Sequence, residues 1–150
     1  MERIDLLKEE TSPTLHDCIV SRASLENGIL TLEFSNNGLT KELAAQGRGK
    51  LCLSVILDER FLDEPFLPSV MQVDHKKLFT RSAVTYSTLK EWVQMLDERD
   101  YKLRISTFIF RGPECFLHVK PIKAGEEQVE KDFYISLLAS TLIYQWDDGN

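Results

Sequence analysis

The segment IVSRASLENGILTLEFS, residues 19–35, decides the fold. Its Asn27-Gly28 pair lies between two segments of alternating apolar residues and is the strongest short-range signal of a β-hairpin, because a type I′ turn needs positive φ at both central residues. A two-residue loop pairs Glu26 with Ile29 and thereby fixes the register. The apolar face then pairs Leu25 with Leu30, Ala23 with Leu32 and Ser21 with Phe34, and the other face pairs Ser24 with Thr31 and Arg22 with Glu33.

Further strands are predicted from β-forming residues and turn signals. Residues 51–57 are apolar on both faces, which predicts a central strand covered on both sides. Residues 101–110 and 115–122, separated by Arg111-Gly112-Pro113-Glu114, predict a second hairpin. Shorter strands are expected at 70–73 and 77–80 around an Asp74-His75-Lys76 turn, and residues 58–69 are expected to form a long loop. Residues 39–46 fit a short helix.

One long helix is predicted at about residues 88–98. Thr88 and Glu91 have capping-box spacing, and Leu89, Trp92, Val93 and Leu96 form one apolar stripe. Residues 133–146 fit both a helix and a strand, and their aromatic and β-branched content favours the strand.

Length and composition support one α+β domain spanning residues 1–150. The 150 residues are 43% hydrophobic, and 24 acidic against 18 basic side chains give a net charge of −6. These values disfavour a disordered chain and a nucleic-acid-binding face. Three widely spaced cysteines disfavour a disulfide scaffold. The charged N-terminus lacks a secretory pattern and no apolar run is long enough to span a membrane, so we expect a cytoplasmic protein without membrane contact.

His16 and Cys18 are weak candidates for a metal or thiol site. On a strand, residues two apart project to the same side, and imidazole and thiolate are preferred zinc ligands. Zinc needs about four such ligands, however, so ordinary packing is the more common role for such a pair. No catalytic or cofactor-binding motif is complete, and we expect no cofactor.

Acidic clusters are candidates for a protein-binding surface. They flank turns and element ends, where clustered carboxylates can steer a basic protein partner. The residues in question are Asp58, Glu59, Asp63, Glu64, Asp97, Glu98 and Asp100.

The order of elements also resembles a known group of proteins. Leu15-His16-Asp17-Cys18 leads into the Asn-Gly hairpin, an amphipathic helix precedes Tyr101-Lys102-Leu103-Arg104-Ile105, and Tyr144-Gln145-Trp146 closes the chain. This pattern resembles small uncharacterised bacterial α+β proteins, some of which are thought to be immunity partners of polymorphic toxins. The resemblance implies a sheet with one helix and a final aromatic strand, and it transfers no catalytic residue.

These observations predict a non-enzymatic protein-binding module, of the immunity type if the resemblance holds. Two alternatives stay open. One is a small enzyme or ligand- or metal-binding domain using His16 and Cys18, and the other is a homo-oligomeric structural protein whose sheet edges pair.

Overall fold

Antiparallel strands account for most of the described chain. The structure, a computed structural model, describes residues 2–6, 15–45, 49–58, 69–77, 80, 83–123 and 130–147. The strands are β1 (Glu2–Leu6), β2 (Ile19–Val20), β3 (Arg22–Glu26), β4 (Ile29–Phe34), β5 (Lys50–Leu57), β6 (Ser69–Asp74), β7 (Val84–Thr88), β8 (Lys102–Arg111), β9 (Glu114–Ile122) and β10 (Lys131–Asp147). The helices are α1 (Lys41–Ala44), α2 (Leu89–Glu98) and the 3₁₀ turns η2 (Asn36–Gly38) and η4 (His75–Lys77).

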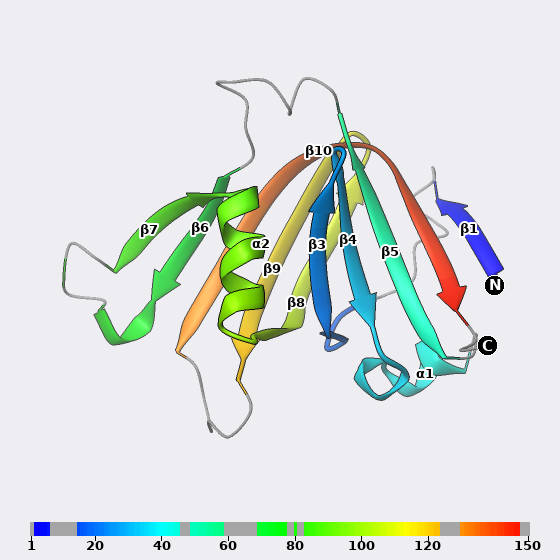
Figure 1. Cartoon of the computed structure of the whole chain (residues 1–150), viewed down its shortest axis with the longest axis horizontal. Coiled ribbons are helices and arrows are strands. Elements are labelled where there is room, and N and C mark those ends of the chain that lie inside the picture. Colours follow the sequence, from blue (N-terminus) through cyan, green and yellow to red (C-terminus); the bar gives the residue numbers. More distant parts are fainter. Residues whose placement is uncertain are drawn as a thin grey trace.

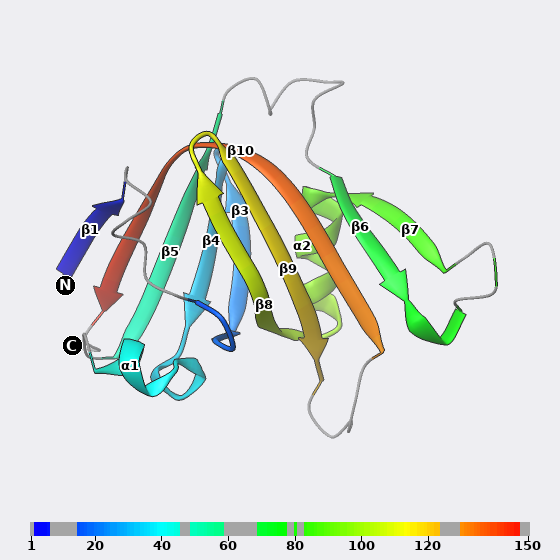
Figure 2. The same cartoon turned by 180° about the vertical axis from the view of Figure 1, so that it is seen from behind.

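The strands form one continuous sheet with two halves, called here the front sheet and the back sheet (Figures 1 and 2). The long strand β10 belongs to both halves and joins them. The front sheet has the order β1-β10-β5-β4-β3, and the back sheet has the order β2-β8-β9-β10-β6-β7. β10 arches over the top of the molecule, so its first half belongs to the back sheet and its second half to the front sheet (Figure 1).

A β-bulge allows β10 to change sheets. Ala139 pairs with Leu57 but Thr141 pairs with Ile56, so Ser140 is an extra residue in the ladder. Before the bulge the buried side chains are Phe133, Ile135, Leu137 and Ala139, and after it they are Leu142, Tyr144 and Trp146. The prediction of a strand over residues 133–146 is therefore confirmed and the helical alternative is wrong. The bulge moves the buried positions of β10 from odd-numbered to even-numbered residues.

The predicted Asn-Gly hairpin is confirmed in its register. Glu26 pairs with Ile29, and the pairs continue without a shift to Arg22 with Glu33. The first strand is shorter than expected, because the chain leaves the back sheet after β2 and enters the front sheet at β3. Ser21 marks this crossing: its backbone N–H donates to the Glu33 carbonyl at 2.7 Å. The expected pairing of Ser21 with Phe34 is therefore absent from the described ladder.

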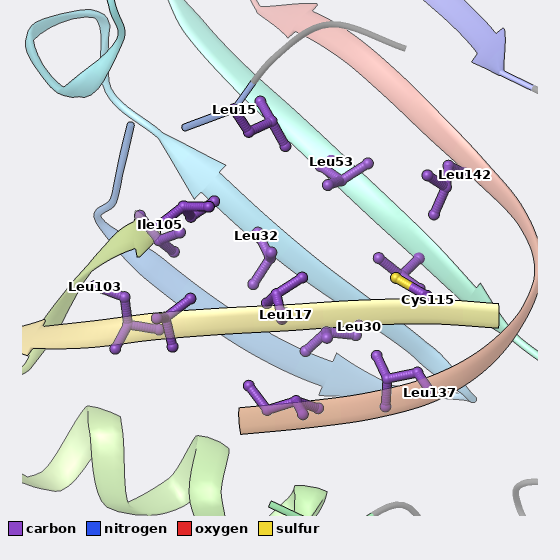
Figure 3. Packing of buried hydrophobic residues seen from close by; sticks show 14 of the residues in the cluster. Leu15, Leu30, Leu32, Leu53, Leu103, Ile105, Cys115, Leu117, Leu137 and Leu142 are labelled. Atoms are coloured by element: carbon purple, nitrogen blue, oxygen red, sulfur yellow. The ribbon is translucent and has the colours of Figure 1, made fainter. Parts of the chain in front are cut away.

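Aliphatic side chains from the two sheets meet to form the core (Figure 3). Leu30, Leu32 and Leu53 come from the front sheet, and Ile105 and Leu117 come from the back sheet; all five are completely buried. Each such side chain contributes roughly 1.5–3 kcal/mol relative to remaining exposed. This shared core holds the two sheets against each other.

Helix α2 covers the side of the core beside β3, and it contacts β3, β6 and β7 (Figure 1). Thr88 forms the predicted capping box with Glu91, which defines the start of the helix. Trp92 is buried on the predicted stripe, with its ring edge-to-face against Phe133 at a centroid distance of 5.7 Å. The helix prediction at 88–98 is confirmed.

Several shorter predictions have mixed outcomes. The β8–β9 hairpin, the short helix α1 and a strand over 70–73 are confirmed. β5 is central as expected, but only its inward residues are buried and its outer ones are half-buried. The strand expected at 77–80 is wrong, because Lys77 belongs to η4 and Thr80 forms a bend. Most of the loop expected at 58–69 lies outside the described residues, and β7 was not predicted.

Candidate binding surface

The outer face of the back sheet is the side turned away from the core, and Figure 2 looks onto it. On β8, β9 and β10 the residues that alternate with the buried core positions project from this face. The outer face is therefore a single layer of side chains that no described helix or strand covers. These side chains come from β6, β7, β8, β9 and the first half of β10.

A carboxylate that binds two imidazoles occupies one end of this face. The Asp132 side chain, from the start of β10, is only 8% exposed. Its Oδ1 accepts a hydrogen bond from Nε2 of His118 at 2.7 Å, and its Oδ2 accepts one from Nε2 of His75. His118 lies on β9 and His75 begins η4, so the carboxylate links three segments that are distant in sequence. Lys120 adds its ammonium 4.0 Å from Oδ1.

These contacts determine the pKa of the carboxyl group. Burial of Asp132 raises its pKa, but the hydrogen bonds from His75 and His118, together with the charge of Lys120, outweigh burial. The pKa of Asp132 is therefore lowered below its ordinary value, and the group is ionised at neutral pH. An ionised carboxylate with two donors orients both rings and ties η4 to the sheet.

Aromatic and apolar side chains continue the face beyond this cluster. The Tyr134 ring stacks on the His118 ring with a centroid distance of 4.3 Å and an interplanar angle of 14°. Across the sheet Tyr134 is directly opposite both His118 and Met71, and Met71 is opposite Tyr86. The resulting row crosses four strands, and its apolar side chains line up next to one another.

All the large hydrophobic side chains that are exposed in the described chain lie on this face. They are Val84 (43% exposed), Tyr86 (70%) and Ile109 (46%). Val84 and Tyr86 are opposite the outward residues Val73 and Met71, and Ile109 is opposite the outward residue Phe116. Exposed apolar side chains scattered over a surface need no explanation, but their restriction to a single face does.

A groove with a volume of about 520 Å³ lies on this face near the β8–β9 turn. Its lining includes Ile109, Phe116 and Leu138, which supply apolar walls, and Arg111 and Ser136, which add polar groups. The groove lies beside the β8–β9 turn and over the paired ends of β9 and β10.

The face carries basic side chains although the chain as a whole is acidic. Arg104 and Lys120 are exposed and directly opposite each other on β8 and β9. Like charges in this arrangement repel each other, and Asp132 is the nearby carboxylate, already engaged by two histidines. The outer face therefore favours neutral or negative groups beside Arg104.

His16 and Cys18 do not come together as expected on one side of a strand. His16 and Asp17 form a turn, and the His16 side chain is 60% exposed, with Nδ1 2.6 Å from the Ser106 carbonyl oxygen. Cys18 is fully buried, and burial raises the pKa of its thiol. The turn, in which Asp17 has a φ of 67°, places the His16 side chain at the surface and the Cys18 side chain in the core. Within the described residues no group of three or more His, Cys, Asp or Glu side chains is arranged to hold a metal ion.

The predicted acidic residues belong to different places. Asp97, Glu98 and Asp100 are exposed at the end of α2, and Asp58 is half-buried just after β5. β5 ends at the top of the molecule and α2 ends near the bottom, so these two groups do not form one surface (Figure 1). Glu59, Asp63 and Glu64 lie outside the described residues.

Sequence reasoning missed the Asp132 cluster and the exposed face. His75 was interpreted as a simple turn residue, and Asp132 is 57 residues away from it in the chain. Two signals pointed to the face: His118 lies on the polar side of its strand, and Asp132 and Tyr134 are two residues apart on theirs. The sequence does not show that these residues are neighbours, because their proximity results from the pairing of β10 with β9 and β6.

Comparison with known proteins does not assign the chain to a family. No protein-family model, curated protein or solved structure matches it. In the described parts of the chain, no helix has the length and apolar character needed to cross a membrane.

Proposed function

We propose that this protein is a protein-binding module whose binding surface is the outer face of the back sheet. The observation that carries the proposal is the restriction of Val84, Tyr86 and Ile109 to that face. Exposed apolar side chains gathered on one face, with polar residues around them, are typical of protein interaction sites. The placement of His16 and Cys18 gives no support to an enzyme that uses them together.

The groove beside Ile109 is the proposed anchoring point. Binding energy in protein interfaces concentrates in a few side chains that fill desolvated pockets. Phe116 and Leu138 provide an apolar wall, and Arg111 and Glu114, which are opposite each other at the border, offer polar groups of both signs to the partner. An aliphatic or aromatic side chain of the partner fits this lining.

The charge of the face bears on the kind of partner. Arg104 and Lys120 favour a partner that is neutral or acidic where it meets them. A basic partner, as an immunity-type role against a basic toxin would require, would instead meet Asp97, Glu98 and Asp100 at the end of α2. Because the two surfaces consist of different residues, mutations can distinguish an immunity-type interaction at the acidic surface from binding at the outer face.

The test is to capture partners from host cells with the tagged protein and to repeat the capture with two variants. Ile109→Glu places a charge in the groove, and we expect it to weaken a specific interaction at least tenfold in a titration with the purified partner. Asp97→Lys changes charge at the acidic surface, and we expect it to leave that interaction unchanged. A partner lost with Asp97→Lys and retained with Ile109→Glu would support the acidic surface and contradict the outer face.

A further inference from the structure

We propose that two copies of this chain pair through the free edge of β7, in antiparallel orientation about a two-fold axis at Tyr86. This inference goes beyond the proposed function, because it concerns self-association rather than partner binding. β7 ends the back sheet: it pairs with β6 on one side, and no described strand pairs with its other side. Figure 2 shows β6 and β7 at one side of the molecule, with β7 on the side of β6 away from β10.

The direction of the backbone groups identifies which residues face the free edge. The Asp74 N–H donates to the Ala83 carbonyl at 2.8 Å, so residues 74 and 83 are a hydrogen-bonded pair. Hydrogen-bonded and non-hydrogen-bonded pairs alternate along an antiparallel ladder. Thr85 and Ser87 therefore bond to β6, whereas the N–H and C=O of Val84 and Tyr86 point to the free edge.

Within the residues that the structure describes, this edge carries none of the protection that exposed edges usually have. Natural edge strands are protected by charges, proline, bulges or a covering element. β7 has the sequence Val-Thr-Tyr-Ser-Thr, without charge or proline, and its pairing with β6 runs without a shift. None of the ten residues from Ser69 to Val73 and from Val84 to Thr88 is charged, although 28% of the chain is charged; Asp74, at the end of β6, lies just beyond them.

This edge suits a second copy better than an unrelated strand. Tyr86 is the central residue of β7, so a two-fold axis there pairs Tyr86 with Tyr86 of the second copy and Val84 with Thr88 of the second copy. The outward groups of Tyr86 then exchange two hydrogen bonds, and no like charges oppose each other. A heterologous partner would usually be selected by complementary charge, and β7 offers none.

The pairing has a consequence for the outer face. A two-fold axis perpendicular to a continuous sheet places both outer faces on the same side. Two binding surfaces would then be presented together, which raises the apparent affinity for a multivalent partner without new contacts. The Thr88 N–H stays committed to Glu91 in the helix cap at 3.0 Å, so α2 keeps its start when β7 pairs.

Sedimentation equilibrium on the full chain tests the proposal. We expect the mass to rise with concentration from the 17.3 kDa of one chain to twice that value and then to level off. Tyr86→Pro removes an outward N–H and leaves the bonds of Thr85 and Ser87 to β6, so we expect at least a tenfold weaker dimer. Val84→Lys adds a charge to the edge and should have the same effect if the proline variant does not fold.

Ile109→Lys is the matched control, because Ile109 is as exposed as Val84 but lies on β8. It should leave the dimer intact even if it abolishes partner binding, so failure of the proposed function and failure of this proposal are distinguishable. A wild-type chain that stays monomeric at millimolar concentration would overturn the pairing. So would a dimer that survives Val84→Lys, or growth beyond a dimer, since an isologous edge is closed after two copies.

Discussion

Asp132→Asn perturbs the centre of the imidazole–carboxylate cluster with little change in shape. The aspartate presents two oxygens, and each accepts a hydrogen bond from one imidazole, His118 on Oδ1 and His75 on Oδ2. Asparagine keeps one oxygen and replaces the other with an amide that donates. One of the two imidazole N–H groups then meets a donor, and the negative charge is lost.

The expected magnitude follows from these contacts. A hydrogen bond to a charged group contributes about 1.5–3 kcal/mol. Asp132 is 8% exposed, so its own interactions are little screened, but the His75 side chain is 41% exposed and solvent weakens that contact. We therefore expect the free energy of unfolding to fall by about 2 kcal/mol, which corresponds to roughly 4–8 °C in Tm for a chain of this size.

Urea denaturation at several pH values is the assay. The pKa of Asp132 is lower in the folded chain than its ordinary value of 3.8, so the folded state binds the proton less tightly. The stabilisation by Asp132 is thus fully present above about pH 4 and is lost as the pH falls through the folded-state pKa. The difference between wild type and variant should be about 2 kcal/mol at pH 7 and should shrink below pH 4.

The matched control is Asp97→Asn, the same chemical change at an exposed position near the end of α2. It should change the free energy of unfolding by less than about 0.5 kcal/mol. The reasoning is refuted if Asp132→Asn is as mild as this control at pH 7. A loss that stays constant from pH 7 to pH 3 would also refute it, because it would show that the charge of Asp132 is not responsible.

Three further predictions concern separate parts of the fold. Thr88→Ala should cost about 1 kcal/mol in urea denaturation, because it removes the hydroxyl that caps α2; no measurable loss would contradict the capping role. A thiol reagent added to the folded protein should label Cys52 first, because it is half-buried whereas Cys18 and Cys115 are buried, and burial raises the pKa of Cys115 to about 12; equal rates for the three thiols would contradict this burial pattern. Insertion of one residue between Thr141 and Leu142 should abolish cooperative thermal unfolding, because Leu142, Tyr144 and Trp146 would turn outward; a cooperative transition near that of wild type would contradict this register.

Local sequence signals predicted the elements that depend on neighbouring residues. Asn27-Gly28 gave the hairpin and its register, and the Thr88–Glu91 spacing gave the start of α2. Each works because a backbone requirement is met within a few residues: positive φ in the turn and an acceptor for the first free N–H groups of the helix. Such requirements do not depend on the rest of the fold.

The errors arose where distant parts of the chain decide the structure. The bulge at Ser140 exists because β10 bonds to β9 in one sheet and to β5 in the other. The sequence of β10 contains both apolar alternations, and nothing within it marks where one replaces the other. In the same way, the position of β7 at the edge of the sheet depends on distant residues. β6 pairs with β10 on one side, which leaves only its other side for β7.

The net charge of −6 illustrates why composition is a poor guide to the partner. It led to the expectation of a basic partner at acidic turns, yet the carboxylates at the end of α2 and the one after β5 are far apart. On the outer face, by contrast, the strand register places Arg104 opposite Lys120, and the nearby Asp132 is engaged by two histidines. Electrostatic steering depends on the local field within about a Debye length, roughly 8–10 Å, rather than on the total charge. The part of this face around Arg104 and Lys120 is therefore locally positive, although the protein as a whole carries a net negative charge.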